Sequence, residues 1–211
     1  MDYTQLRAEA RDLLRGRWNT CALLMFIVSV LSGSVSLIFG LGNTQFLSSP
    51  LSILVGAPLN LGVTAIFLKL YEGHNFQIEE VFNGFRDFSR AVISGLLISV
   101  YVILWSFLLI VPGIIAALGY SMTFFILVEN PQLSASQAMA LSKEMMLGHK
   151  TELFMLSLSF IGWFFLSLFT FGIGIFWLAP YVDMSYTIFY HRVKAHGGVV
   201  NPGETVTGII R

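Results

Sequence analysis

Residues 91–128, AVISGLLISVYVILWSFLLIVPGIIAALGYSMTFFILV, contain no charged side chain over 38 positions. A single helix of that length would measure about 57 Å, whereas the hydrocarbon layer of a bilayer is about 30 Å thick. The stretch therefore predicts two transmembrane helices, at about 91–111 and 114–128. We expect the turn at Pro112 and Gly113, because proline ends the preceding helix and glycine turns freely.

The flanking sequence repeats this arrangement. Uncharged apolar stretches predict spans at about 20–41 and 51–68, separated by a turn-rich loop, GNTQFLSSP, at 42–50. The segment 153–190 contains one charge, Asp183, and a turn sequence at 171–174, which predicts spans at about 153–170 and 175–190. We therefore expect an all-α, polytopic membrane helix bundle of six transmembrane helices in three hairpins. It forms a single domain, 1–194, and a Gly- and Pro-containing flexible tail follows at 195–211.

Composition supports a membrane protein and excludes several other classes. Hydrophobic residues make up 55% of the chain and charged residues 11%, and the mean hydropathy is +0.76. Soluble domains carry about 25% charged residues, so a soluble fold is excluded. The formal net charge is zero, which gives no basis for a nucleic-acid partner. The single cysteine, Cys21, allows neither an internal disulfide nor a cysteine-based metal cluster.

A charged, amphipathic stretch precedes each hairpin. These stretches predict cytoplasmic surface helices at about 3–16, 77–90 and 134–147, the third beginning at a possible capping box from Ser134 to Gln137. Such helices commonly lie in the headgroup layer. Their apolar faces are formed by Tyr3, Leu6, Ala10, Leu13 and Leu14, by Ile78, Val81, Phe82, Phe85 and Phe88, and by Ala138, Leu141 and Met145.

The basic residues predict the orientation. All twelve Lys and Arg residues lie in these three stretches, at the ends of the neighbouring spans, or in the tail, and the three opposite loops contain none. By the positive-inside rule, the basic side and both chain ends are cytoplasmic.

The three units also share a weak sequence pattern. Gly16, Gly84 and Gly148 each end a predicted surface helix, and an acidic residue stands four positions before each glycine. An internal repeat about an axis along the membrane normal would produce this pattern. The alternative is that a glycine, an acid and a base are expected wherever an interfacial helix meets a span.

Asp183 lies near the middle of the sixth predicted span. A charge at that depth is costly, so the residue is a candidate functional site. Its candidate partners are Asn60 and Thr64 in the second span and Tyr120 or Ser121 in the fourth. The alternative is a neutral acid that forms a hydrogen bond with a Tyr or Ser and holds the helices together.

Two prolines, Pro58 and Pro180, lie inside predicted spans. Each can kink its helix or expose a backbone carbonyl at a binding site. No nucleophile–base pair, phosphate-binding loop or metal-ligand spacing is present in the sequence, so we expect no enzyme, no metal and no cofactor.

The most specific segment is 108–165, with Pro112-Gly-Ile-Ile, Ser121-Met-Thr-Phe and Glu129-Asn-Pro. Together with residues 7–18 and FNGFRDF at 82–88, it resembles a bacterial membrane-protein family catalogued as domain of unknown function 975. The resemblance extends to about Lys194. The family is also distantly similar to the membrane domain attached to some glycerophosphodiester phosphodiesterases, whose catalytic domain this chain does not contain. The resemblance implies a bacterial plasma membrane protein and assigns no activity or site residues.

Two functions follow as hypotheses. The first is a non-enzymatic scaffold or accessory protein that binds membrane lipids, anionic ones in particular, or a protein partner or second copy. The second is a transporter of a small solute, peptide or lipid, with a cavity around Asp183.

Overall fold

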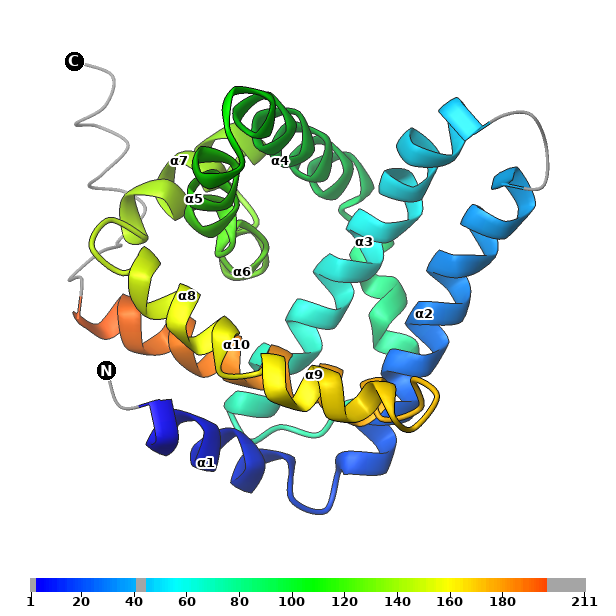
Figure 1. The fold of residues 1–211 in the computed structure, drawn as a ribbon, viewed down its shortest axis with the longest axis vertical. Coiled ribbons are helices and arrows are strands. Elements are labelled where there is room, and N and C mark those ends of the chain that lie inside the picture. Colours follow the sequence, from blue (N-terminus) through cyan, green and yellow to red (C-terminus); the bar gives the residue numbers. More distant parts are fainter. Residues whose placement is uncertain (1–2, 41–44, 197–211) are drawn as a thin grey trace.

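The computed structural model describes residues 3–40 and 45–196, and no strand occurs in these two ranges. The fold is all-α (Figure 1). Its helices are α1 (Tyr3–Leu14), α2 (Trp18–Gly40), α3 (Gln45–Tyr71), the 3-10 helix η1 (Ile78–Phe85), α4 (Phe88–Leu108), α5 (Ile110–Tyr120), α6 (Thr123–Glu129), α7 (Ala135–Met145), α8 (Lys150–Leu158), α9 (Ile161–Leu168) and α10 (Ile175–His196).

Within the described ranges, four stretches of helix are long and apolar enough to cross a membrane: Ser52–Tyr71, Phe88–Phe107, Ile110–Glu129 and Lys150–Leu168. A fifth is obtained if α1 and the described part of α2, which meet at a bend of 93°, count as one span. Helix α10 is not among them, because Asp183 and a basic end interrupt its apolar sequence.

Helix α10 supplies much of the buried core. It packs against α1, α2, α3 and α9, and Met184, Ile188 and Phe189 are fully buried. The apolar face of α1 is likewise buried through Leu6, Ala10 and Leu14, because α1 packs directly on α10. The amphipathic pattern of residues 3–16 therefore marks a contact with the protein itself. Figure 1 shows α1 and α10 along the same side of the molecule, with α2 and α3 packed together on another.

Two predicted spans are interrupted in the structure. The stretch 114–128 is divided into α5 and α6 at Ser121 and Met122, and 153–170 is divided into α8 and α9 at Ser159 and Phe160. In both breaks a serine hydroxyl donates to a backbone carbonyl three residues earlier, at 2.8 Å from Ser121 Oγ and 2.6 Å from Ser159 Oγ. Such local hydrogen bonds compete with the helical pattern and accompany both breaks, although Ser34 makes the same bond to Leu31 within unbroken α2.

The turn predicted at Pro112 and Gly113 is wrong by about three residues. The chain reverses at Leu109, whose backbone is extended, and Pro112 lies in the first turn of α5. Proline fits there because the first backbone N–H groups of a helix have no helical partner. Gly113 contributes differently: a Cβ there would collide with Ser106 of α4, so glycine allows α4 and α5 to pack closely.

Three other boundaries also differ from the sequence prediction. The predicted loop 42–50 is already helical from Gln45, although Ser48, Ser49 and Pro50 are weak helix formers. The predicted amphipathic α-helix at 77–90 is instead η1, followed by the beginning of α4 at Phe88. The predicted tail overlaps the end of α10 at residues 195 and 196, and its remainder lies outside the described residues. The turn at 171–174 is confirmed, with Phe171 and Gly172 at positive φ.

The three glycines of the proposed repeat adopt two kinds of backbone geometry. Gly16 and Gly148 have φ of +80° and +83°, in the left-handed region that favours glycine. Gly84 has no positive φ and instead packs against the carbonyl of Pro58 in α3. The second unit therefore departs from the other two at this position.

Candidate functional site

Asp183 lines a cavity of about 260 Å³ between α2, α3, α6 and α10. The side chain is half-buried, and its carboxylate makes no hydrogen bond or ion pair with another described residue. The remaining wall is formed by Met25, Val28, Ser32, Gly56, Asn60, Val63, Thr64, Phe67, Phe125 and Thr187. The structure thus places one acidic group in a cavity whose lining is mostly apolar with a few polar side chains.

Two of the residues predicted to surround Asp183 are present in this cavity. Asn60 and Thr64 lie one helical turn apart on α3, and Thr64 Oγ1 donates to the Asn60 carbonyl at 2.9 Å. Thr187 Oγ1 donates in the same way to the carbonyl of Asp183 at 2.8 Å. Because both threonine protons are used within their own helices, the Asn60 amide, the Asp183 carboxylate and the Ser32 hydroxyl are the polar groups that line the cavity for a ligand.

The other two predicted partners lie elsewhere. Tyr120 packs its ring against Tyr101, with centroids 5.9 Å apart, and Ser121 donates to the Leu118 carbonyl. Neither residue lines the Asp183 cavity. Both prolines lie inside helices: Pro180 lies within α10, and Pro58 lies within α3, where its carbonyl faces Gly84 of η1.

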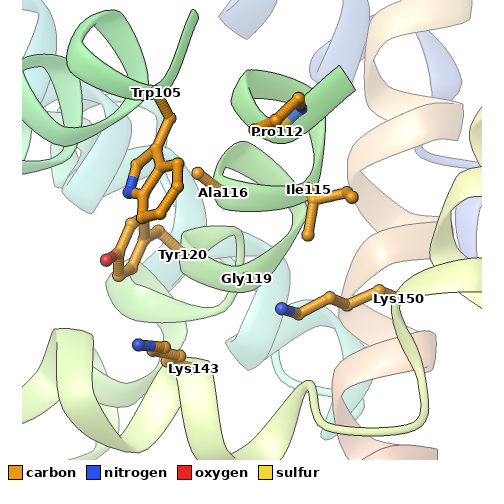
Figure 2. A pocket seen from close by; sticks show the side chains of 8 residues that line it. All are labelled: Trp105, Pro112, Ile115, Ala116, Gly119, Tyr120, Lys143 and Lys150. Carbon is orange, nitrogen blue, oxygen red and sulfur yellow. The ribbon is translucent and has the colours of Figure 1, made fainter. Parts of the chain in front are cut away.

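Tyr120 instead lines a second pocket, of about 310 Å³, between α4, α5, α7 and α8 (Figure 2). Lys143 and Lys150 lie at one end of this pocket, and Trp105 and Pro112 lie at the other. From the sequence alone, these lysines indicate the orientation of the chain but not a binding site. Their position on either side of Gly148, where the chain turns from α7 into α8, was the available signal that they lie close in space.

Several polar contacts join segments that are far apart in the sequence. Arg17 donates to Asn75 at 2.8 Å, and Arg192 pairs with Glu9 at 2.6 Å. Glu129 accepts from Tyr190 at 2.6 Å and also pairs with Lys194. A further cluster forms at Arg90, whose guanidinium donates to the backbone carbonyls of Leu127, Asn130 and Leu133.

No group of three or more His, Cys, Asp or Glu side chains in the described ranges could hold a metal ion. The arrangement therefore offers two features with binding chemistry: a carboxylate in a small cavity, and two lysines beside an apolar pocket.

The fold thus defines a class, an all-α protein with at least four helices of membrane-spanning length and apolarity. Within that class, the chain belongs to the family described as Protein of unknown function (DUF975), which it matches over residues 1–118 and 107–197. Searches of curated proteins and of solved structures returned no match.

Proposed function

We propose that the chain is a non-enzymatic integral protein of the bacterial plasma membrane that binds anionic lipids at the cytoplasmic side, as a scaffold or accessory protein. The observation that carries this proposal is the exposed apolar surface of α4 and the α9–α10 turn. Phe107 is 86% exposed and Phe171 is 100% exposed, and many of their neighbours are large, exposed and apolar. Apolar surface of this extent is typical of contact with lipid or a partner.

In this proposal the chain crosses the bilayer six times, as three hairpins with both ends in the cytoplasm. The long-range polar contacts support this arrangement. The pairs Arg17–Asn75, Arg192–Glu9 and Lys194–Glu129, together with the Arg90 cluster, all join segments that the basic residues assign to the cytoplasmic side. A common side explains why these segments meet.

The predicted cytoplasmic side also has apolar groups suited to the headgroup layer. Phe82, Phe85 and Phe88 are exposed and their rings follow one another, with centroids 6.3 and 6.4 Å apart. An apolar strip beside basic residues is the arrangement that binds the surface of an anionic bilayer.

The test is lipid retention by the purified full-length chain. The protein is reconstituted in vesicles of equal phosphatidylglycerol and phosphatidylcholine, extracted with a mild detergent, and the retained lipid is measured by mass spectrometry. We expect phosphatidylglycerol to be enriched over phosphatidylcholine. Equal retention of the two lipids would contradict the proposal.

The Asp183 cavity favours a second candidate function, a transporter of a small solute, peptide or lipid. A transport pathway requires water to reach the cavity. In a Cys21→Ala background, Asn60→Cys and Asp183→Cys should then react with an aqueous thiol reagent, and Tyr120→Cys reports on the neighbouring pocket. Protection of both cavity positions would exclude this candidate. Asp183→Asn is the paired variant, because it keeps the side-chain size and removes the charge.

A further inference from the structure

The pocket of Figure 2 has two chemically different ends. Its walls come from four helices, and its apolar part is formed by Trp105 of α4 with Pro112, Ile115 and Ala116 of α5. Its basic part is formed by Lys143, near the end of α7, and Lys150, the first residue of α8. Figure 2 shows both ammonium groups at the same end, below Gly119 and Tyr120. A pocket with this division matches a molecule that has an anionic head and an apolar tail.

The two lysines are free to bind an anion. Neither has a hydrogen bond or an ion pair with any other residue in the ranges that the structure describes. In contrast, Lys69, Arg90, Arg192 and Lys194 each pair with a carboxylate. Two ammonium groups that converge without a carboxylate repel each other, and a phosphate between them would relieve that repulsion.

Gly119 contributes to the basic end. A Cβ at residue 119 would lie 3.5 Å from Lys150 Cε and 3.6 Å from Lys150 Nζ, so the lysine side chain lies directly over this glycine of α5. Lys150 thus lies along this part of α5 at ordinary contact distance, in the same pocket as Lys143.

The apolar end is continuous with the exposed apolar surface of the α4–α5 pair. Trp105 is 45% exposed and Ile115 is 46% exposed, and Leu104, Phe107, Val111 and Ile114 are exposed beside them. A free phosphate ion would use none of this surface. The apolar wall and its continuation favour a membrane lipid as the occupant over a soluble anion.

We propose that this pocket binds one anionic phospholipid, with the phosphate between Lys143 and Lys150 and an acyl chain along α5 past Ala116 and Trp105. This assignment rests on the proposed function and gives anionic lipid binding a defined site. Each basic residue close to an anionic headgroup strengthens the binding of that lipid by about fivefold. The two lysines together therefore set most of the preference for an anionic over a neutral lipid.

The experiment is the lipid competition described above, applied to four forms of the full-length chain. Lys143→Gln/Lys150→Gln removes the two pocket charges. The matched control, Arg11→Gln/Arg15→Gln, removes two exposed charges on the same predicted side, outside the pocket. Ala116→Phe fills the apolar part without changing any charge. Size-exclusion profiles and melting temperatures establish that each form is folded.

We expect the wild type and the arginine control to retain phosphatidylglycerol preferentially, and the lysine variant to lose at least about fivefold of that preference. Ala116→Phe should also retain less phosphatidylglycerol. If the wild type shows no preference, the proposed function fails. If the wild type prefers phosphatidylglycerol and the lysine variant retains the same preference, only the pocket assignment fails.

A further arm distinguishes a lipid from free phosphate. Excess inorganic phosphate, compared with chloride at equal ionic strength, should leave the retained phosphatidylglycerol in place. Displacement by phosphate would show that the apolar wall does not contribute and would overturn the assignment to a lipid. If the lysine variant does not fold, Ala116→Phe decides the assignment: unchanged retention in that variant overturns it.

Discussion

Glycine allows α3 and η1 to pack in direct backbone contact. A Cβ on Gly62 would collide with the carbonyl of Val81, and a Cβ on Gly84 would collide with the carbonyl of Pro58. Backbone atoms cannot move aside as a flexible side chain does, so the helices would have to separate. This contact also places Val81 in the core, where it is fully buried.

Gly62→Ala and Gly84→Ala should each destabilise the protein by about 1–3 kcal/mol, as overpacking does in a close-packed interior. The measurement is the melting temperature in detergent. Gly33→Ala in α2 is the control, because no atom lies within 4 Å of the Cβ that it adds. The explanation is wrong if the three variants melt at the same temperature as the wild type.

The same two elements are joined by an ion pair. Lys69 Nζ lies 2.6 Å from Glu80 Oε2, and this hydrogen bond lowers the pKa of Glu80 below its usual 4.5. The side chains are 48% and 25% exposed, so the pair contributes at most about 1 kcal/mol. A carboxyl with a lowered folded-state pKa stabilises the fold above its unfolded pKa, and this contribution is lost as the pH falls through the folded-state value.

Glu80→Gln should therefore melt slightly below the wild type at neutral pH, and the difference should close as the pH falls below about 4. Melting temperatures of both proteins across this pH range give the comparison. A difference that does not change with pH would mean that the charge of Glu80 is not the source of its contribution.

At the scale of elements, the capping box predicted at the beginning of α7 is confirmed. Gln137 N donates to Ser134 Oγ, and Ser134 N donates to Gln137 Oε1 at 2.9 Å. This cap sets the beginning of the helix that carries Lys143.

Ser134→Ala should destabilise α7 by about 1 kcal/mol, while Ser134→Asp should preserve the cap because aspartate also accepts from the first-turn amides. Hydrogen–deuterium exchange of the first turn of α7 measures the effect directly. Exchange that is equally slow in wild type and Ser134→Ala would show that other contacts hold this end of the helix.

Hydrophobic length and charge located the helices from the sequence, but not their breaks. The first, second, third and sixth predicted spans each correspond to one helix, because long uncharged stretches leave few alternatives. At the breaks, Ser121 and Ser159 each donate to a carbonyl three residues earlier, but Ser34 does the same within unbroken α2, so serine alone does not indicate a break. The turn at Leu109 rather than Pro112 depends on how closely α4 and α5 pack through Gly113.

The candidate sites were predictable to a similar degree. Asp183 stood out because it is the one charge in a long apolar stretch, and its proximity to Asn60 and Thr64 is realised in the cavity. The pocket at Lys143 and Lys150 was missed because its walls come from four separate helices. No spacing along the chain indicates that Trp105 of α4 lies beside lysines of α7 and α8.

At the scale of the whole molecule, the core and the exterior are divided in an unusual way. The strongly apolar helices α4 and α9 have large exposed side chains, whereas α10, with its central aspartate, is among the most buried. In water this arrangement would expose extensive apolar surface. In the bilayer that we propose, α4 and α9 would face lipid, whereas α10 packs against α1, α2, α3 and α9.

The six-span topology assigns each turn to one side of the membrane, and that assignment can be measured. The measurement is the reactivity of single cysteines, in a Cys21→Ala background, toward a membrane-impermeant thiol reagent added to intact bacterial cells. The three predicted outer turns are reported by Thr44→Cys, Leu109→Cys and Phe171→Cys. The predicted cytoplasmic side is reported by Asn75→Cys and Leu147→Cys.

The six-span account predicts labelling at residues 44, 109 and 171 in intact cells, and labelling at residues 75 and 147 only after the membrane is permeabilised. Labelling of 75 or 147 in intact cells, or protection of 109 or 171 until permeabilisation, would contradict it.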